Sequence, residues 1–347
     1  MPILYVTEPG AMVRLAGESL VVTLDEDPDG AAGPEPKRRR TLLELEPHRL
    51  EMIALVGRAN ATTDAVMLCL EKGIALAWFS RGGDFLGRLV PQSPRSADLR
   101  LLQYRVVSEP QARLERARGV VTAKLGNALE ALRDIQSNDS ANPLLAPAMA
   151  ELKRLAGEAG NCLDQERLLG LEGTGAREYF RALGGSFRGE IGFQGRQRRP
   201  PPDPANALLS FGYVLMGNRL AGMLEARGLD PALGFYHQVR PGRPSLALDL
   251  LEELRHPLVD RFVLRVCNLR ILRSEMFEAD QQRGGVRLTR EGLKVFFREW
   301  EKNLQRTIRE REQTERPTVL ALLRRQVERL AADLRGGEPY RPLAYGG

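Results

Sequence analysis

Cysteine is scarce in this chain, and long apolar runs are missing. The three cysteines, Cys69, Cys162 and Cys267, form no C-x-x-C pair, which argues against a disulfide framework and a cysteine zinc site. No apolar run approaches the ~18 residues that a membrane span needs. The N-terminus lacks a charged region followed by an apolar one, so no secretory signal is visible. We therefore expect a cytoplasmic protein with free thiols and no membrane segment.

The composition is that of a globular protein with more basic than acidic residues. Of 347 residues, 43% are hydrophobic and 28% are charged, so the chain can build a sizeable core. The length indicates about two domains at roughly 150 residues each. The 51 basic residues exceed the 45 acidic ones by six, a net charge of +6, which favours a polyanionic partner.

Residues 1–95 have the pattern of a small β-rich domain with one helix. Short apolar segments separated by turn residues predict strands, and Gly17 and the pair Gly82-Gly83 predict hairpin turns. Thr62 or Thr63 can cap a helix that Gly73 ends. The expected strands are 3–6, 11–15, 19–24, 42–45, 52–56, 74–79 and 85–90, with the helix ending at Glu71.

The segment Asp25–Arg40 is rich in Pro, Gly and charge, with acids first and Lys37 to Arg40 last. It reads as a charged hairpin tip. Either it is a solvated loop or its basic end contacts nucleic acid.

From residue 96 onward the apolar spacing is helical almost to the end. Expected helices are 97–107, 109–136, 144–157, 162–183, 204–227, 245–278, 290–313 and 317–335. We therefore predict an α+β, multidomain fold: a β-rich domain at 1–95 and an all-α domain at 96–347. Residues 336–347 are predicted to be a loose tail.

One stretch, Tyr236–Arg255, combines a histidine with acids. His237 lies in a Pro/Gly-rich turn before a helix that starts near Ser245. Asp249 and Glu252 are three residues apart and share a helix face. Alone, these acids form either a solvated face or a metal site, and His237 alone is either an ordinary hydrogen-bonded histidine or a metal ligand. Arg240 and Arg243 lie in the sequence between His237 and the two acids. A histidine, two acids and two arginines together suggest a divalent cation held next to phosphate.

Upstream, Glu172 is followed by Gly173 and Gly175 inside a helical pattern. Glycine in a helix interior costs on the order of 1 kcal/mol relative to alanine, so these glycines call for a reason. The reason is either close approach of a backbone or ligand, or easier helix packing beside a surface carboxylate.

A loop before the helix at 204 carries clustered arginines, among them Arg196, Arg198 and Arg199. Arginines in a loop can grip phosphates bidentately, and a helix N-terminus capped by Asp203, with Pro204 in its first turn, adds partial positive charge. The alternative is a basic surface loop that binds no phosphate.

Together, these segments resemble the CRISPR-associated spacer integrase family, the endonuclease/integrase of CRISPR adaptation. The resemblance rests on GRANATTDAVMLCLEKGIALAWFSRGGDFLGRL (57–89), LEGTGAREYF (171–180), GRQRRPPPDPANALLSFGY (195–213) and GFYHQVRPGRPSLALDLLEELRHPLVDR (234–261). It spans nearly the whole chain, and RRPPPDPANALLSFGY is its most specific part.

The resemblance implies metal ligands at Glu172, His237 and Glu252, with Asp249 as a further acid of the catalytic pocket. It also implies a β-rich domain for dimerisation and partner contacts, a helical catalytic domain, a homodimer, and a complex with a small CRISPR-associated ferredoxin-like protein. Carboxylates with one imidazole suit Mg²⁺ or Mn²⁺. The charged hairpin looks longer than is usual in this family, and its role is unassigned.

The main hypothesis is a metal-dependent DNA endonuclease/integrase that inserts short foreign DNA as new spacers into a CRISPR array. The nucleophile would be a DNA 3′-hydroxyl, so no Ser, Cys or Tyr nucleophile is required. Arg196, Arg198, Arg199, Arg240 and Arg243 would contact double-stranded DNA, both the incoming prespacer and the CRISPR repeat. Two alternatives stay open: a non-catalytic DNA-binding scaffold, and a transposon-borne integrase of the same chemistry.

Overall fold

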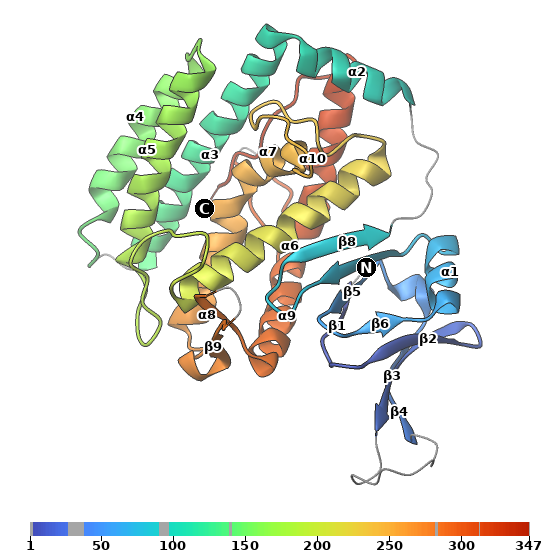
Figure 1. Ribbon diagram of the computed structural model, residues 1–347. Helices are drawn as coiled ribbons and strands as arrows, with labels where there is room; N and C mark the ends of the chain where they lie inside the picture. The colour runs from blue at the N-terminus through green and yellow to red at the C-terminus, as the bar shows by residue number, and fades with distance from the viewer. Residues whose placement is uncertain are drawn as a thin grey trace. The chain divides into compact units, whose positions relative to one another are not determined.

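The computed structural model describes residues 3–26, 38–89, 97–138, 141–281, 284–311 and 313–346. The chain divides into two compact units. The first contains Met1–Ser93 and Thr289–Glu301, and the second contains Pro94–Leu288 and Lys302–Gly347. The described part of the chain has the predicted α+β class, with strands concentrated in the N-terminal region and helices after it (Figure 1).

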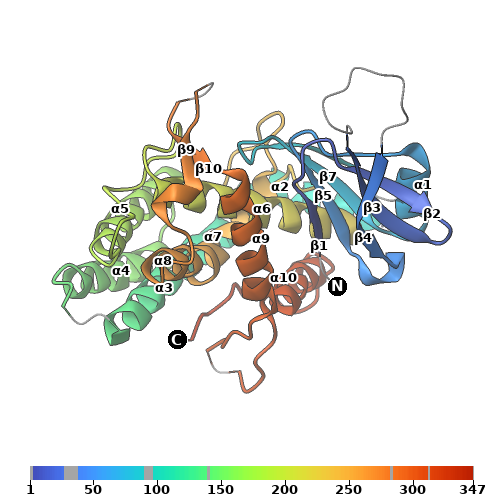
Figure 2. The same cartoon turned by 90° about the horizontal axis from the view of Figure 1, so that it is seen from below.

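The first unit contains two four-stranded sheets. One has the order β1 (Ile3–Val6), β5 (Met52–Val56), β7 (Ala75–Phe79), β8 (Phe85–Leu89). Its first three strands are parallel and β8 is antiparallel to β7. The other has the order β4 (Arg38–Leu45), β3 (Ser19–Glu26), β2 (Met12–Ala16), β6 (Asn60–Ala61). Figure 2 shows strands of both sheets from below.

A shared apolar core holds these sheets and helix α1 (Thr63–Glu71) together. Val13 and Leu20 from one sheet and Ile53 and Leu76 from the other belong to one buried cluster, as does Cys69 from α1. The predicted turns are confirmed, because Gly17 and Gly83 both have positive φ, a conformation that favours glycine. Thr62 caps α1 by accepting a hydrogen bond from Ala65 N.

Most of helix α9 (Arg290–Gln305) belongs to the first unit, although its sequence lies far downstream. The Tyr5 ring of β1 stacks on Phe297 at 4.0 Å, and the Tyr5 hydroxyl donates to Glu301 at 3.0 Å. The division therefore differs from the predicted 1–95 and 96–347 at this segment. Apolar spacing identifies a helix but does not show which core the helix packs on.

The charged segment 25–40 is described only at its ends. Strands β3 and β4 extend into it and pair from Leu20↔Leu45 to Glu26↔Arg38. Arg39 forms an ion pair with Asp25 at 3.2 Å. Residues 27–37, which include the predicted loop tip, lie outside the described residues, as does the predicted domain boundary between residues 95 and 96.

The second unit is built around the long helix α3 (Pro110–Asn138). Helices α4 (Leu145–Gly160) and α5 (Gln165–Gly184) lie beside it (Figures 1 and 2). The other elements are α2 (Ala97–Ser108), α6 (Pro204–Arg227), α7 (Ser245–Leu254), a π-helical segment Arg255–Asp260, α8 (Arg261–Asn268), a 3₁₀ turn Ser274–Met276, β9 (Phe277–Ala279), β10 (Val286–Leu288) and α10 (Val319–Leu334).

Two features of this unit differ from an all-α prediction. The expected helix 245–278 is interrupted by the π-helical segment, which contains Pro257, and the helical structure ends at Asn268. Proline lacks the backbone N–H that an α-helix needs and crowds the preceding turn, which explains the local widening. After the turn, β9 and β10 form a two-stranded antiparallel sheet.

Helix α6 is a long apolar helix of the second unit. An 18-residue window within it has a mean hydropathy of 1.2, enough by length and composition to cross a membrane. Its few polar residues interrupt the apolar run, so the sequence did not indicate a long apolar segment here. However, 67% of that window is buried inside the fold, as expected of a core helix.

The prediction that residues 336–347 form a loose tail is wrong for the described part of this segment. Leu343 and Tyr345 are buried. Asn127 of α3 donates to Leu343 O at 2.8 Å and accepts from Tyr345 N at 2.9 Å. The tail is therefore anchored on the central helix.

Candidate metal and DNA site

Helix α7 is buried on almost every side, including its acids. Asp249, Glu252 and Glu253 are each at most 3% exposed. The apolar positions Leu246, Leu250 and Leu254 are buried as well. A solvated acidic face is therefore excluded, and each carboxylate must be balanced by internal partners.

Asp249 organises the turn that carries His237. Its Oδ2 accepts from Phe235 N at 2.6 Å and Tyr236 N at 3.0 Å, and its Oδ1 accepts from His237 N at 2.9 Å. The same Oδ1 lies 2.7 Å from His237 Nδ1. When Nδ1 carries the proton, it donates to this carboxylate, and Nε2 keeps its lone pair.

Gly234 makes this arrangement sterically feasible. A Cβ at this position would lie 2.6 Å from Asp249 Oδ2 and 2.8 Å from Ser245 C. Only glycine lets the backbone approach α7 this closely.

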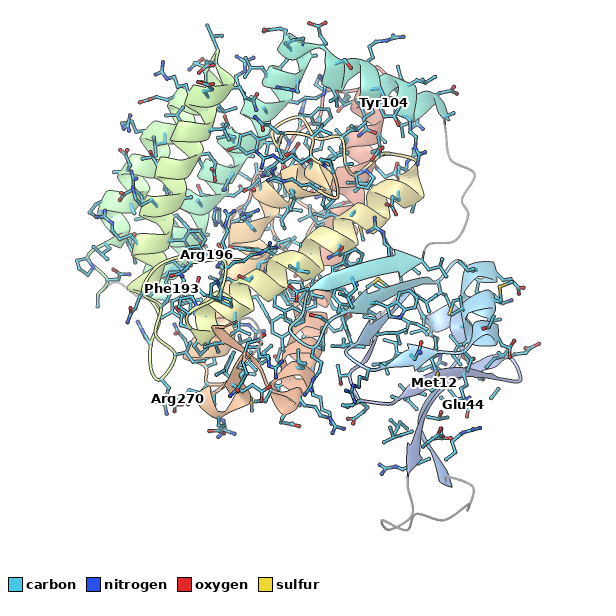
Figure 3. All side chains as sticks on the ribbon, viewed as in Figure 1. Met12, Glu44, Tyr104, Phe193, Arg196 and Arg270 are labelled. Atoms are coloured by element: carbon cyan, nitrogen blue, oxygen red, sulfur yellow. The ribbon has the colours of Figure 1, made fainter. Side chains whose placement is uncertain are left out.

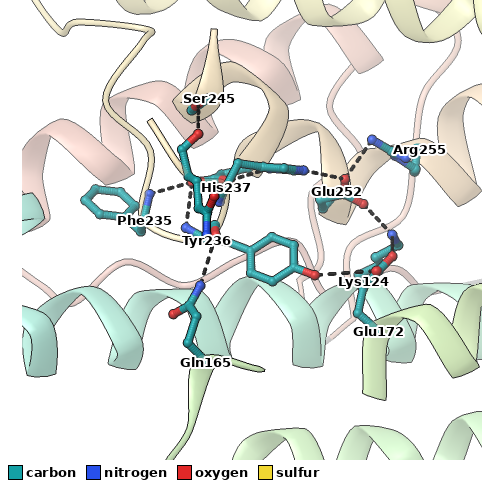
Figure 4. Close-up of polar contacts among 11 residues, drawn as sticks. Lys124, Gln165, Glu172, Phe235, Tyr236, His237, Ser245, Glu252 and Arg255 are labelled. Carbon is teal, nitrogen blue, oxygen red and sulfur yellow. Dashed lines mark hydrogen bonds and ion pairs between the residues drawn. The ribbon is translucent and has the colours of Figure 1, made fainter. Parts of the chain in front are cut away.

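Glu252 lies where the histidine, a lysine and an arginine meet (Figure 4). Its Oε1 is 3.7 Å from His237 Nε2 and 2.7 Å from an Arg255 nitrogen, and its Oε2 is 2.5 Å from Lys124 Nζ. Burial alone would raise the pKa of Glu252. The cations Arg255 and Lys124 and the nearby His237 outweigh burial and hold this pKa well below its ordinary value.

Glu172 reaches the same cluster from α5. Its Oε1 forms an ion pair with Lys124, and its Oε2 accepts a 3.4 Å hydrogen bond from the Tyr236 hydroxyl. With 18% of its side chain exposed, it is no surface carboxylate. Burial, and then the charges of Glu172 and Glu252, raise the pKa of Tyr236 far above its ordinary value, so this phenol stays protonated and donates.

Glu172, His237, Asp249 and Glu252 are thus brought together from three separate segments. Two of them, Glu172 and Glu252, contact the Lys124 ammonium. In the described ranges, no three His, Cys, Asp or Glu side chains are arranged tightly enough to form a closed metal-binding group. The donor set itself, two carboxylates with an imidazole nitrogen, fits a Mg²⁺ or Mn²⁺ ion.

Known proteins resemble this chain over most of its length. The family model "CRISPR associated protein Cas1" matches residues 4–302. "CRISPR-associated endonuclease Cas1 3" of Thermus thermophilus is 35% identical over 306 residues, covering 87% of this chain and 89% of that relative.

The chain belongs to the Cas1 family.

Two solved structures share the fold of this Cas1-family chain. "Casposase bound to integration product" has a TM-score of 0.81 at 21% identity, covering 98% of this chain and 92% of that chain. "Cas6-RT-Cas1--Cas2 complex" has a TM-score of 0.79 at 21% identity, covering 99% of this chain and 36% of that chain. At this identity, the two structures establish the shared fold.

The five arginines predicted to contact DNA differ in their surroundings in this Cas1-family structure. Arg198, Arg199 and Arg240 are exposed, and Arg243 is half-buried. Arg196 points inward instead: it donates to Asn206 Oδ1 at 2.9 Å and to Ser210 Oγ at 3.0 Å, and lies over the Tyr213 ring. Asn206 also donates to Gly195 O at 2.9 Å. Arg196 therefore ties its loop to α6.

A pocket of about 660 Å³ lies between α5 and this loop. Its lining includes Arg177, Arg181 and Arg198 together with the rings of Phe180 and Phe193. Phe193 and Arg196 are labelled in Figure 3. Ala176 and Phe180 follow Glu172 at four-residue steps, so the pocket begins one turn from Glu172 on the same face of α5. Arginines with aromatic rings suit a phosphate chain with stacked bases.

The residues predicted from the sequence of this Cas1-family chain did not include Lys124, Tyr236 and Arg255, which contact the candidate site. A signal for Lys124 was present. It is flanked by the buried residues Val121 and Leu125 and lies on the apolar side of α3. A lysine in an apolar stripe needs a buried acidic partner.

Proposed function

We propose that this protein is a metal-dependent DNA endonuclease/integrase that inserts short foreign DNA fragments as new spacers into a CRISPR array. The observation that carries the proposal is the convergence of Glu172, His237 and Glu252 in a member of the Cas1 family. The reaction is a transesterification. A DNA 3′-hydroxyl forms a new bond to phosphorus, the old phosphodiester bond breaks, and its oxygen leaves as a new 3′-hydroxyl.

Glu172, His237 and Glu252 would hold the divalent cation. When bound, Mg²⁺ or Mn²⁺ would lower the pKa of the attacking hydroxyl and neutralise charge on the reacting phosphate. Asp249 holds the His237 ring with Nε2 facing Glu252. Tyr236 keeps its proton and orients one oxygen of Glu172. The buried setting of these side chains limits competing hydrolysis by water.

Arg198, Arg199, Arg240 and Arg243 supply cationic groups for the DNA backbone of prespacer and repeat, and the pocket beside α5 offers a path for a strand toward Glu172. Arg196 supports this surface by fixing the loop that presents Arg198. DNA binding through these groups would weaken steeply with salt. A solved casposase of the same fold is bound to an integration product, which supports a DNA-binding role.

For assembly, we propose a homodimer that works with the small ferredoxin-like CRISPR-associated protein. The first unit would provide the dimerisation and partner contacts. The support is that a solved structure of the same fold is a complex containing Cas2.

A strand-transfer assay tests the proposal. A labelled DNA fragment is incubated with a plasmid carrying the CRISPR repeat and Mg²⁺ or Mn²⁺, with and without EDTA. We expect joined product only with the metal, and none from a fragment with a 3′-dideoxy end. Glu172→Gln, His237→Ala and Glu252→Gln should each lower the rate more than about hundredfold.

Glu166→Gln is the matched control, because Glu166 is an exposed carboxylate on the same helix α5, and it should leave the rate unchanged. Full activity in all three site variants would remove the assigned site. DNA binding without strand transfer under any metal condition would establish the alternative, a non-catalytic scaffold.

A further inference from the structure

Lys124 is the buried cation at the centre of the site, and no part of the mechanism above uses it. It extends from α3 with 4% of its side chain exposed, and its ammonium forms ion pairs with Glu172 from α5 and Glu252 from α7. Its helix neighbours Val121 and Leu125 are buried. The stem therefore lies in the core, and only the ammonium reaches the acids.

The ammonium contacts one oxygen of each carboxylate, Oε1 of Glu172 and Oε2 of Glu252. The opposite oxygen of Glu172 accepts from Tyr236, and the opposite oxygen of Glu252 contacts Arg255 and lies near His237. Lys124 thus contacts one oxygen of each of the two carboxylates that would hold a divalent cation. Two cations held by the same pair of buried carboxylates would repel each other strongly, since buried charges are weakly screened.

We propose that Lys124 is an internal counter-ion that competes with the divalent cation for Glu172 and Glu252. This inference rests on the proposed function, because it assumes that these two carboxylates hold the metal. In the metal-free protein, Lys124 neutralises buried acids that would otherwise be uncompensated. A bound metal ion would displace the Lys124 ammonium, and the flexible unbranched stem would allow this movement without moving α3.

Among the described residues these candidate ligands form no closed metal-binding group, and two of them contact Lys124. The two carboxylates are arranged around a single positive charge supplied by the chain. Their closure around a divalent ion becomes favourable only when that charge leaves. The affinity for metal is therefore lower than the donor set alone would produce.

Mn²⁺ binding, measured by the loss of the free-ion electron paramagnetic resonance signal, tests this inference on the full chain without DNA. Lys124→Met keeps the length of the stem and removes the charge. We expect it to bind Mn²⁺ at least about tenfold more tightly than the wild type. Lys153→Met is the matched control, since Lys153 is an exposed lysine of α4 in the same unit, and it should bind like the wild type.

Two further variants separate the outcomes. Glu252→Gln should abolish Mn²⁺ binding. Retention of wild-type binding there, or no binding by any protein, would overturn the proposed metal site and the inference with it. If Glu252→Gln fails to bind while Lys124→Met binds no more tightly than the wild type, the inference alone is wrong.

Circular dichroism and thermal unfolding check that each variant is folded. Without metal, Lys124→Met should unfold at a lower temperature than the wild type. Added Mn²⁺ should raise its unfolding temperature more than it raises that of the wild type. Lys124→Arg keeps the charge, so it should bind Mn²⁺ no more tightly than the wild type. Tenfold tighter binding by Lys124→Arg would contradict competition by charge, even if Lys124→Met does not fold.

Discussion

Asp249 is the residue on which the local geometry of the site depends most directly. One buried carboxylate accepts hydrogen bonds from three successive backbone N–H groups and contacts the ring of His237. Its removal leaves three buried donors and one imidazole N–H without their acceptor. Each unsatisfied buried donor costs about 1–3 kcal/mol.

We therefore predict that Asp249→Ala lowers the free energy of unfolding by at least about 3 kcal/mol. Asp249→Asn keeps an acceptor oxygen and should cost less stability, but it no longer fixes the His237 tautomer and should lower metal affinity about 10- to 100-fold. Urea unfolding and Mn²⁺ binding measure the two effects. An Asp249→Ala protein within 1 kcal/mol of the wild type would show that the turn does not depend on this carboxylate.

At the scale of elements, the contact between α3 and α5 sets where Glu172 stands relative to Lys124. Gly175 lies at this contact. A Cβ there would come within 2.2 Å of Leu125 Cδ2 and 3.4 Å of Leu152 Cδ2. Gly173, two residues earlier, has nothing within 4 Å of the same position. Packing therefore accounts for one of the two glycines that follow Glu172.

These glycines form a matched pair for a test of the helix contact. Gly175→Ala should destabilise the protein by about 1–3 kcal/mol through overpacking. Gly173→Ala should be neutral or stabilise it by up to about 1 kcal/mol, since it replaces glycine in an uncrowded helix interior. Thermal unfolding measures both. Equal shifts for the two variants would contradict the packing explanation.

At the scale of the whole molecule, the C-terminal tail and the site are joined through neighbouring residues of α7. Glu252 faces the site, and Glu253 accepts from the Tyr340 hydroxyl at 2.6 Å, Leu343 N at 2.8 Å and Gln326 at 3.0 Å. Burial raises the pKa of Glu253 to about 7, although these donors partly oppose the shift. Tyr340 and Leu343 of the C-terminal tail therefore contact α7 at Glu253, the residue next to Glu252.

This raised pKa predicts a pH-dependent stability. Between the ordinary pKa of 4.5 and about 7, the folded carboxyl keeps a proton that the unfolded chain has lost. The free energy of unfolding should therefore fall as pH rises through this window, by on the order of 3 kcal/mol at most. Glu253→Gln should flatten this dependence in urea unfolding between pH 5 and pH 7.5. An unchanged slope in the variant would assign the dependence to other groups.

Much of the fold was predictable because local patterns specify it. Strand β5, helix α1 with its Thr62 cap and helix α6 with its Asp203 cap were all expected from alternation, caps and turn residues. The interruption of the expected helix 245–278 was not, since the spacing of its leucines continues across Pro257.

The sequence by itself determined the class of the fold, its main helices and the family motifs that contain Glu172, His237, Asp249 and Glu252. Only the tertiary structure decided that α9 packs with the β-rich unit, that Arg196 turns inward and that Lys124 lies between two acids. The physical reason is the range of the interactions. Periodicity, caps and turns act between residues a few positions apart, whereas a buried charge finds its partner across helices that are distant in the chain.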